Sequence, residues 1–197
     1  QLTKAATVAD IGSGTGLLAE AFLKDGFRVI GVEPNPDMRL AAQHLLRSYP
    51  RFVSVAATAE ATTLDPRSVD MITVGQAFQF FDRDRTRQEF ARILGPQGWV
   101  VLVRLIPRRN TAFLAAYDQF WRKYCDPKGH GGGKEMQDDE LRAWYAPGQV
   151  DVQAFDTAQV VDYEGLKGRV LSASKAPTPE QPQYPAMIEE LEGLFRN

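Results

Sequence analysis

The stretch VADIGSGTG, from Val8 to Gly16, constrains the fold of this chain more than any other feature. It begins with a short, mostly apolar run typical of a buried strand, and glycines follow at positions 12, 14 and 16. Glycine lets a backbone turn sharply, and without a Cβ the backbone N–H groups can approach a ligand closely. The stretch therefore predicts a strand, a glycine-rich turn and the start of a helix, an arrangement that holds nucleotide-like ligands.

Strand and helix patterns alternate through the first half of the chain. Strands are expected at Thr7–Ile11, Phe27–Glu33, Phe52–Ala57, Val69–Val74 and Trp99–Leu105. Helices are expected at Leu17–Lys24, Asn35–Arg47 and Asp82–Leu94, the last closed by Gly95 and Pro96. The strands are almost continuously apolar, as strands buried on both faces are. This pattern predicts an α/β fold: a Rossmann-like, doubly wound, mostly parallel sheet with helices on both faces.

The second half of the chain has a different character. Its patterns predict an aromatic-rich helix over Asn110–Tyr124, a short helix from Asp138 or Asp139 through Tyr145, a strand over Val150–Val161 and a helix over Glu180–Phe195. We therefore expect a core over residues 1–106, a helical cap over 107–150 inserted after the fifth strand, and a segment over 151–197 that completes the same domain. The aromatic face would either line a substrate pocket or pack as ordinary core, and core packing is favoured.

Composition excludes several classes of function. A net charge of −2 argues against a dedicated nucleic-acid-binding protein. Cys125 is the only cysteine, so an intramolecular disulfide and a cysteine-rich zinc site are excluded, and two scattered histidines give no metal-ligand spacing. The apolar runs are too short to span a membrane. We expect a cytoplasmic protein that binds neither metal, nucleic acid nor membrane, and no oligomeric state is predicted.

Two carboxylates flank the glycine turn. Asp10 stands just before it, where it can accept from an ammonium group or a bridging water, and Glu33 ends the next predicted strand, where it can accept both hydroxyls of a ribose. The dinucleotide spacing fails when counted from Gly12 and fits when counted from Gly14, so a nicotinamide or flavin cofactor stays open. No Gly-Lys-Ser/Thr follows the turn, which excludes a P-loop.

DIGSGTG followed by GVEPNPDM resembles the class I S-adenosylmethionine-dependent methyltransferases. The longer runs VADIGSGTGLLAEAF, ATAEATTLDPRSVDMITVGQAFQFFD and EFARILGPQGWVVLV are similar to the type 11 branch, which includes relatives of trans-aconitate methyltransferase. The resemblance covers residues 7 to 105, and parts of the tail also resemble this branch. It implies S-adenosylmethionine as cofactor and a small molecule as methyl acceptor.

The resemblance also assigns cofactor-binding residues at the ends of four strands. The turn around the methionine part would contain Asp10, Gly12, Ser13, Gly14 and Gly16. Glu33 would bind the ribose, Pro34 and Met38 would line the adenine pocket, Ala59 and Glu60 would meet the adenine edge, and Gln76 and Ala77 would border the sulfonium. Glu60 has the alternative of an acid at a helix start, and Gln76 and Ala77 that of a plain turn after a strand.

The chain departs from the family pattern at several points. Relatives often carry a histidine where this chain has Gln79, so a histidine base at that position is excluded. The family's last strand and its first helix are not in the sequence, from which we expect a trimmed chain.

No catalytic residue is assigned. His44 is expected in a helix and His130 in a glycine-rich loop, and neither is a strong candidate for a general base. A substrate carboxylate could pair with Arg104, Arg108 or Arg109. Two other functions stay open, a nicotinamide-dependent oxidoreductase and a non-catalytic relative that binds the cofactor.

Overall fold

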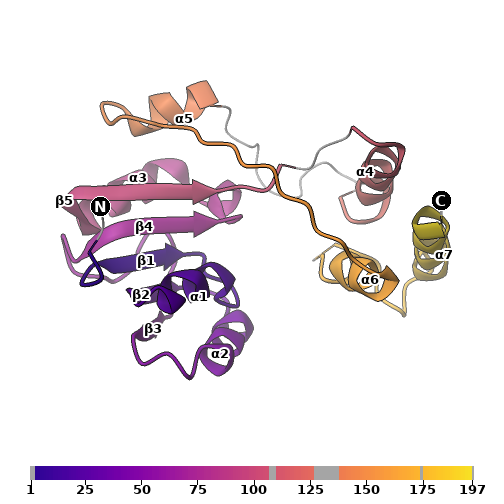
Figure 1. The fold of residues 1–197 in the computed structure, drawn as a ribbon, viewed down its shortest axis with the longest axis horizontal. Coiled ribbons are helices and arrows are strands. Elements are labelled where there is room, and N and C mark those ends of the chain that lie inside the picture. The colour runs from indigo at the N-terminus through magenta and orange to yellow at the C-terminus, as the bar shows by residue number, and fades with distance from the viewer. Residues whose placement is uncertain (1–2, 107–109, 127–137, 174, 197) are drawn as a thin grey trace. The chain divides into compact units, whose positions relative to one another are not determined.

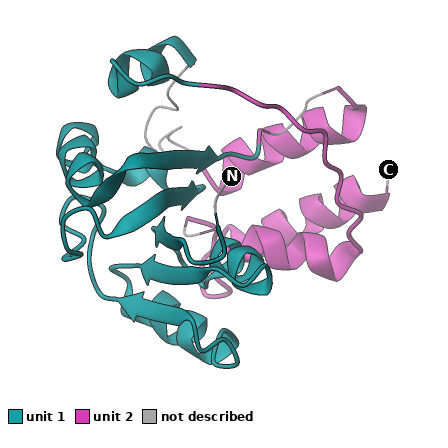
Figure 2. Cartoon of the chain, turned by 60° about the vertical axis from the view of Figure 1, so that its left-hand side comes forward, with its two compact units in different colours: residues 1–105, 136–150 teal, residues 106–135, 151–197 magenta. Residues whose placement is uncertain are grey.

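The computed structural model describes residues 3–106, 110–126, 138–173 and 175–196. It divides into two compact units, coloured separately in Figure 2. Unit 1 comprises residues 1–105 and 136–150, and unit 2 comprises residues 106–135 and 151–197. These boundaries differ from the three predicted segments, because the stretch 107–150 contributes to both units. The role of that stretch as a cap over the substrate stays a prediction.

Unit 1 is built on a parallel sheet of five strands in the order β3-β2-β1-β4-β5. The arrows of β5, β4 and β1 point the same way in Figure 1. The strands are β1 (Thr7–Ile11), β2 (Arg28–Val32), β3 (Phe52–Val55), β4 (Val69–Gly75) and β5 (Leu94–Val103). The chain order 3-2-1-4-5 reverses direction between β1 and β4, which defines a topological switch point at their carboxyl ends.

Helices cover both faces of this sheet because side chains alternate along each strand. On β1, Val8 belongs to the core beneath α1 (Leu17–Lys24), whereas Ala9 and Ile11 belong to the core beneath α3 (Arg83–Ile93). The other helix on the first face is α2 (Pro36–Leu45), and a 3-10 turn, η1 (Phe78–Phe80), follows β4. The sheet and its helices confirm the predicted α/β, Rossmann-like fold.

Helix α5 (Asp138–Tyr145) also belongs to unit 1. Its Trp144 packs edge-on against Phe78, with ring centroids 5.1 Å apart, and also contacts Phe90. The indole Nε1 donates a hydrogen bond to the carbonyl of Arg83 at 3.0 Å. Apolar packing and a hydrogen bond therefore hold α5 against η1 and α3 within unit 1.

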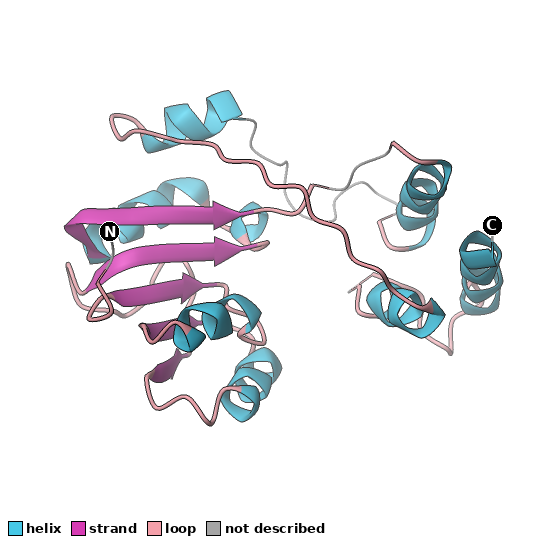
Figure 3. Cartoon of the chain, viewed as in Figure 1, coloured by secondary structure: helices cyan, strands magenta, loops and turns pink. Residues whose placement is uncertain are grey.

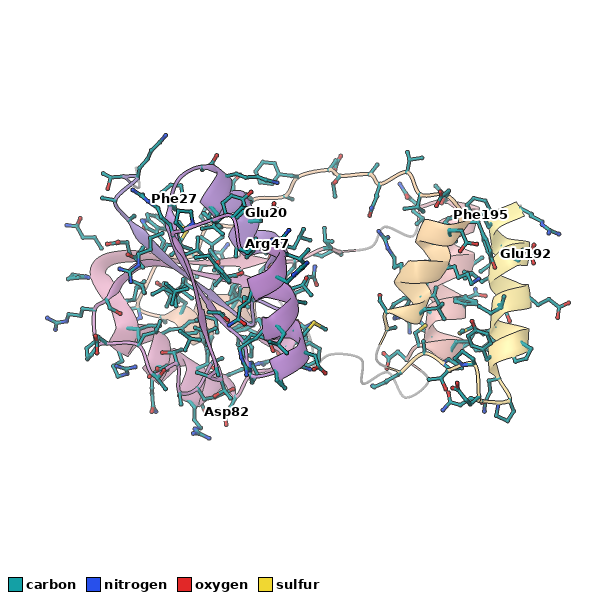
Figure 4. All side chains as sticks on the ribbon, turned by 90° about the horizontal axis from the view of Figure 1, so that it is seen from below. Glu20, Phe27, Arg47, Asp82, Glu192 and Phe195 are labelled. Carbon is teal, nitrogen blue, oxygen red and sulfur yellow. The ribbon has the colours of Figure 1, made fainter. Side chains whose placement is uncertain are left out.

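Unit 2 contains α4 (Ala112–Tyr124), α6 (Tyr163–Leu171) and α7 (Tyr184–Arg196). The aromatic face of α4 supplies Phe120 and Tyr124 to a core that also holds residues of α6 and α7. This confirms that most of the aromatic face is core packing. Phe195, labelled on α7 in Figure 4, packs against Tyr163 of α6 with ring centroids 5.6 Å apart.

Three element predictions need correction. The predicted strand over Val150–Val161 is wrong, since Figure 3 draws this segment as loop. Its apolar side chains are exposed, Phe155 at 85% and Val160 at 99%, because no neighbouring strand pairs with it among the described residues. Helix α6 was not predicted, although Asp162 caps it by accepting from the N–H of Gly165.

Strand β5 begins earlier than predicted. It starts at Leu94, which pairs with Val69, and the pairing resumes with Trp99 opposite Met71 after a register shift. Leu94 therefore ends α3 and begins β5 directly, and Gly95 and Pro96 lie within the strand segment rather than closing the helix.

Candidate functional site

The candidate site lies in unit 1, at the carboxyl ends of β1, β2, β3 and β4. These four strand ends carry every cofactor-binding residue that the resemblance assigned. Ligands of open α/β sheets bind in this region, beside the switch point where the strand order reverses. The fold thus brings the residues to one edge of the sheet, although they are spread over much of the first half of the chain.

The glycine turn has the conformation that its sequence demands. Gly12, Gly14 and Gly16 all have positive φ angles, of 69°, 54° and 87°. The N–H groups of Gly12 and Ser13 both donate to the carbonyl of Val32, at 2.8 and 3.2 Å, so the turn is attached to the end of β2. A Cβ on Gly16 would lie 2.6 Å from Leu46, so this glycine allows the start of α1 to pack closely against the end of α2.

Glu33 follows β2 and is buried, with 9% of its surface exposed. Its Oε2 accepts from the N–H of Gly14 and its Oε1 from the N–H of Asn35, both at 2.9 Å. These two backbone donors fix the plane of the carboxylate beside the glycine turn. Each carboxylate oxygen has a second lone-pair direction, so the group can still accept from the hydroxyls of a ligand.

Asp10 is the most buried charged side chain of the site, with 1% of its surface exposed. Its Oδ1 accepts from the hydroxyl of Thr73 on the adjacent strand β4, at 2.9 Å. Its Oδ2 is buried and has no hydrogen-bond partner in the described part of the chain. Burial raises the pKa of Asp10 to about 6, and the charge of Glu33 adds to this shift, although the hydroxyl of Thr73 and the backbone of Ala19 oppose it. A buried acceptor without a partner is a place where a cationic or hydrogen-bonding ligand group is expected.

The turn after β4 contacts the glycine turn directly. Gln76 has a φ of 56°, unusual for a residue other than glycine, and its carbonyl accepts from the Nε2 of Gln79 at 2.7 Å. A Cβ on Gly12 would lie 2.5 Å from the Cβ of Ala77. The missing side chain of Gly12 is therefore what allows the turns after β1 and β4 to meet. Backbone strain of this kind at Gln76 is frequent at functional sites.

The segment after β3 carries Ala59 and Glu60. Ala59 is buried, and the Oε1 of Glu60 accepts from the N–H of Asp82 at 2.9 Å, at the start of α3. Partial burial alone would raise the Glu60 pKa, but the hydrogen bonds from Asp82 and Thr58 and the charge of Arg85 outweigh it and lower the pKa. This contact corresponds to the alternative of an acid at a helix start, and the assignment of Glu60 to the adenine stays a prediction.

Pro34 and Met38 follow β2, and both side chains are exposed, Met38 at 44%. Sequence reasoning overlooked Arg39, whose Nη1 donates to the carbonyls of Glu33 and Pro34 at 2.9 and 2.7 Å. It also overlooked Thr73, the partner of Asp10. The available signal for Thr73 was a polar residue between Ile72 and Val74 in the apolar part of β4.

The remaining candidates are less well placed. The imidazole of His44 on α2 lies 3.3 Å from Nη1 of Arg47, and Nη2 of Arg104 lies 3.3 Å from Oδ1 of Asp138. Arg108, Arg109 and His130 lie outside the described residues. Within the described ranges there is no group of three or more side chains suited to hold a metal ion. No helix in that part of the chain is long and apolar enough to cross a membrane.

Comparisons with known proteins find similarity to methyltransferases. A family model described as "Methyltransferase domain" matches residues 9–102. An uncharacterized methyltransferase of Mycobacterium tuberculosis is 38% identical over 96 residues, 49% of this chain and 38% of the relative. A ubiquinone/menaquinone biosynthesis C-methyltransferase of Campylobacter jejuni is 25% identical over 134 residues, 64% of this chain and 56% of the relative.

Among solved structures, the YcgJ protein from Bacillus subtilis matches with a TM-score of 0.59 and 25% identity, over 74% of this chain and 62% of that chain. The matched part covers less than two thirds of the length of each of these three proteins. The family match lies within residues 9–102, which contain the glycine turn and the four strand ends of the candidate site.

Proposed function

We propose that this chain binds S-adenosylmethionine at the carboxyl ends of β1 to β4 and transfers its methyl group to a small-molecule acceptor. The observation that carries the proposal is the position of Glu33, whose carboxylate lies 2.9 Å from the N–H of Gly14 in the glycine turn. A buried acid beside such a turn can accept from both hydroxyls of a ribose. The family match favours this function over the nicotinamide-dependent alternative.

The residues present fit this cofactor. The buried Oδ2 of Asp10 needs a donor, and the ammonium group of the methionine part would supply one, directly or through a water. The turn formed by Gly12, Ser13, Gly14 and Gly16 would surround the methionine part. In the same proposal Pro34, Met38, Ala59 and Glu60 would surround the adenine, and Gln76 and Ala77 would border the sulfonium.

The cofactor, when bound, supplies a methyl group on a good leaving group. The chain then has to hold the acceptor atom in line, about 3 Å from the methyl carbon, and to exclude water. A carboxylate acceptor needs no general base, and we assign none. A small-molecule acceptor is supported by the name of the Campylobacter relative, which is that of a quinone biosynthesis enzyme. Cys125 is the only cysteine in the sequence, which fits a reducing compartment, and we place the enzyme in the cytoplasm.

Isothermal titration calorimetry with S-adenosylhomocysteine tests the proposal. We expect micromolar affinity for the wild type and a loss of about 1–3 kcal/mol in Glu33→Ala, the range for hydrogen bonds to charged groups. Lys24→Ala, an exposed change at the far end of α1, is the matched control and should leave the affinity unchanged. Absence of binding, or binding of NADH in its place, would contradict the proposal.

Turnover is a separate measurement. Formation of S-adenosylhomocysteine from S-adenosylmethionine, followed with a panel of small carboxylic acids, phenols and amines, distinguishes an enzyme from a relative that only binds the cofactor. We expect at least one class of acceptor to raise the rate above the background hydrolysis of the cofactor.

A further inference from the structure

The segment after β3 is attached to α3 at two points. The first is the hydrogen bond from the N–H of Asp82 to Glu60. Asp82, labelled in Figure 4, is the N-cap residue of α3. The second point is Thr62, which is fully buried and contacts Glu89 near the middle of the same helix. Ala59 and Glu60, assigned to the adenine edge, therefore belong to a segment whose position α3 sets.

Glu89 makes an unusually complete set of hydrogen bonds for a side chain that is only 8% exposed. Its Oε1 accepts from both the N–H and the hydroxyl of Thr62, at 2.8 and 2.5 Å. Arg92, one turn further along α3, donates from Nε to Oε2 and from Nη2 to Oε1, both at 2.7 Å. The guanidinium holds the carboxylate in one plane, and that plane fixes where Thr62 lies.

The backbone on both sides of Thr62 has an irregular conformation. Thr63 has a φ of 61°, a left-handed conformation that a β-branched residue rarely adopts. On the other side, Thr58 and Ala61 form an isolated antiparallel bridge. The segment is thus a short closed turn followed by a strained residue, and the two hydrogen bonds to Glu89 are made between these two features.

We propose that Glu89 is a positioning residue for the cofactor. Through Thr62 it holds the Ala59–Glu60 turn in the position where this turn contacts the adenine. The inference rests on the proposed function. The carboxylate of Glu89 contacts Thr62 and Arg92. In this proposal it does not contact the ligand. Its effect should therefore be confined to the part of the cofactor that meets this turn.

The test compares two ligands of the full chain. S-adenosylhomocysteine carries the adenine, and S-ribosylhomocysteine carries the same homocysteine and sugar without the base. Affinities are measured by competition against radiolabelled S-adenosylmethionine. We expect Glu89→Ala to weaken S-adenosylhomocysteine by about tenfold or more, the effect of losing a charge-assisted hydrogen bond, and to leave S-ribosylhomocysteine unchanged. Thr62→Val should give the same selective loss and Thr62→Ser, which keeps the hydroxyl, should not.

A purely structural role would weaken both ligands by the same factor, and that result, or no loss for either ligand, overturns the proposal. Asp84→Ala, an exposed change on the same helix, controls for general effects on α3. If Glu89→Ala fails to fold, Glu89→Gln keeps an acceptor for Thr62 and the Thr62 pair carries the test. A wild type that binds neither ligand overturns the proposed function itself, so the two failures are distinguishable.

Discussion

Gly12 and Gly14 have the same kind of backbone conformation but different surroundings. Both have positive φ, yet a Cβ on Gly12 would meet Ala77 at 2.5 Å and a Cβ on Gly14 would meet nothing within 4 Å. Gly14→Ala should cost about 1–2 kcal/mol for the left-handed conformation alone. Gly12→Ala should cost about 1–3 kcal/mol more, because the added methyl group overpacks the contact with Ala77. Urea unfolding measures both, and equal losses would contradict the role given to Ala77.

Asp10 makes the stability of the protein depend on pH. Its pKa is raised from 3.8 to about 6 by burial, so the folded chain binds this proton more tightly than the unfolded chain. The stabilisation from the protonated form is complete below the unfolded pKa and is lost as the pH rises through about 6. Relative to Asp10→Asn, the wild type should lose up to about 3 kcal/mol between pH 4 and pH 7.

Chemical denaturation of both variants at four or five pH values checks this prediction. The readout is the difference in free energy of unfolding between the two proteins, since other carboxylates titrate in both and cancel. A difference that stays constant with pH would show that the pKa of Asp10 is the same in the folded and the unfolded chain, which would contradict the prediction. In the presence of the cofactor the pH dependence should weaken, because an ammonium group near Oδ2 favours the carboxylate.

At the scale of elements, the aromatic face of α4 contains both buried and exposed side chains. Phe120 is 1% exposed in the core shared with α6 and α7, whereas Phe113 is 38% exposed. Phe120→Ala should destabilise the protein by about 3–5 kcal/mol, the usual cost of emptying a buried aromatic site. Phe113→Ala is the matched control and should cost much less. Equal losses in thermal or chemical unfolding would mean that the face is packed differently.

The elements also show where local patterns are sufficient. β1 and α1 begin and end at the predicted residues, because apolar continuity, the glycine turn and the terminal Gly26 are all local signals. Helix α6 was missed because Gly165 and Gly168 lower its helix propensity, and it is stabilised by packing Leu166 and Val170 against its neighbours.

At the scale of the molecule, the site depends on four strand ends acting together. Hydrogen exchange measured by mass spectrometry should show S-adenosylhomocysteine protecting segments 12–16, 33–38, 58–62 and 75–79. NADH at the same concentration should protect none of them. Protection limited to one segment would contradict a site formed by four strand ends.

S-adenosylhomocysteine at one hundred times its dissociation constant should also stabilise the folded chain by about 2.7 kcal/mol.

The sequence by itself determined the α/β fold and the glycine turn, because these depend on short-range periodicity and on residue types that few other structures require. The tertiary structure decided which side chains meet. Glu33 contacts Gly14 across 19 residues, Thr73 contacts Asp10 across 63, and Glu89 contacts Thr62 across 27. No local pattern specifies such contacts. The first two depend on the register of strands that pair only in the folded sheet, and the third depends on how α3 packs beside the segment after β3. The same reason explains the wrong strand over Val150–Val161, where alternation is present but no pairing strand exists within the part of the chain that the structure describes.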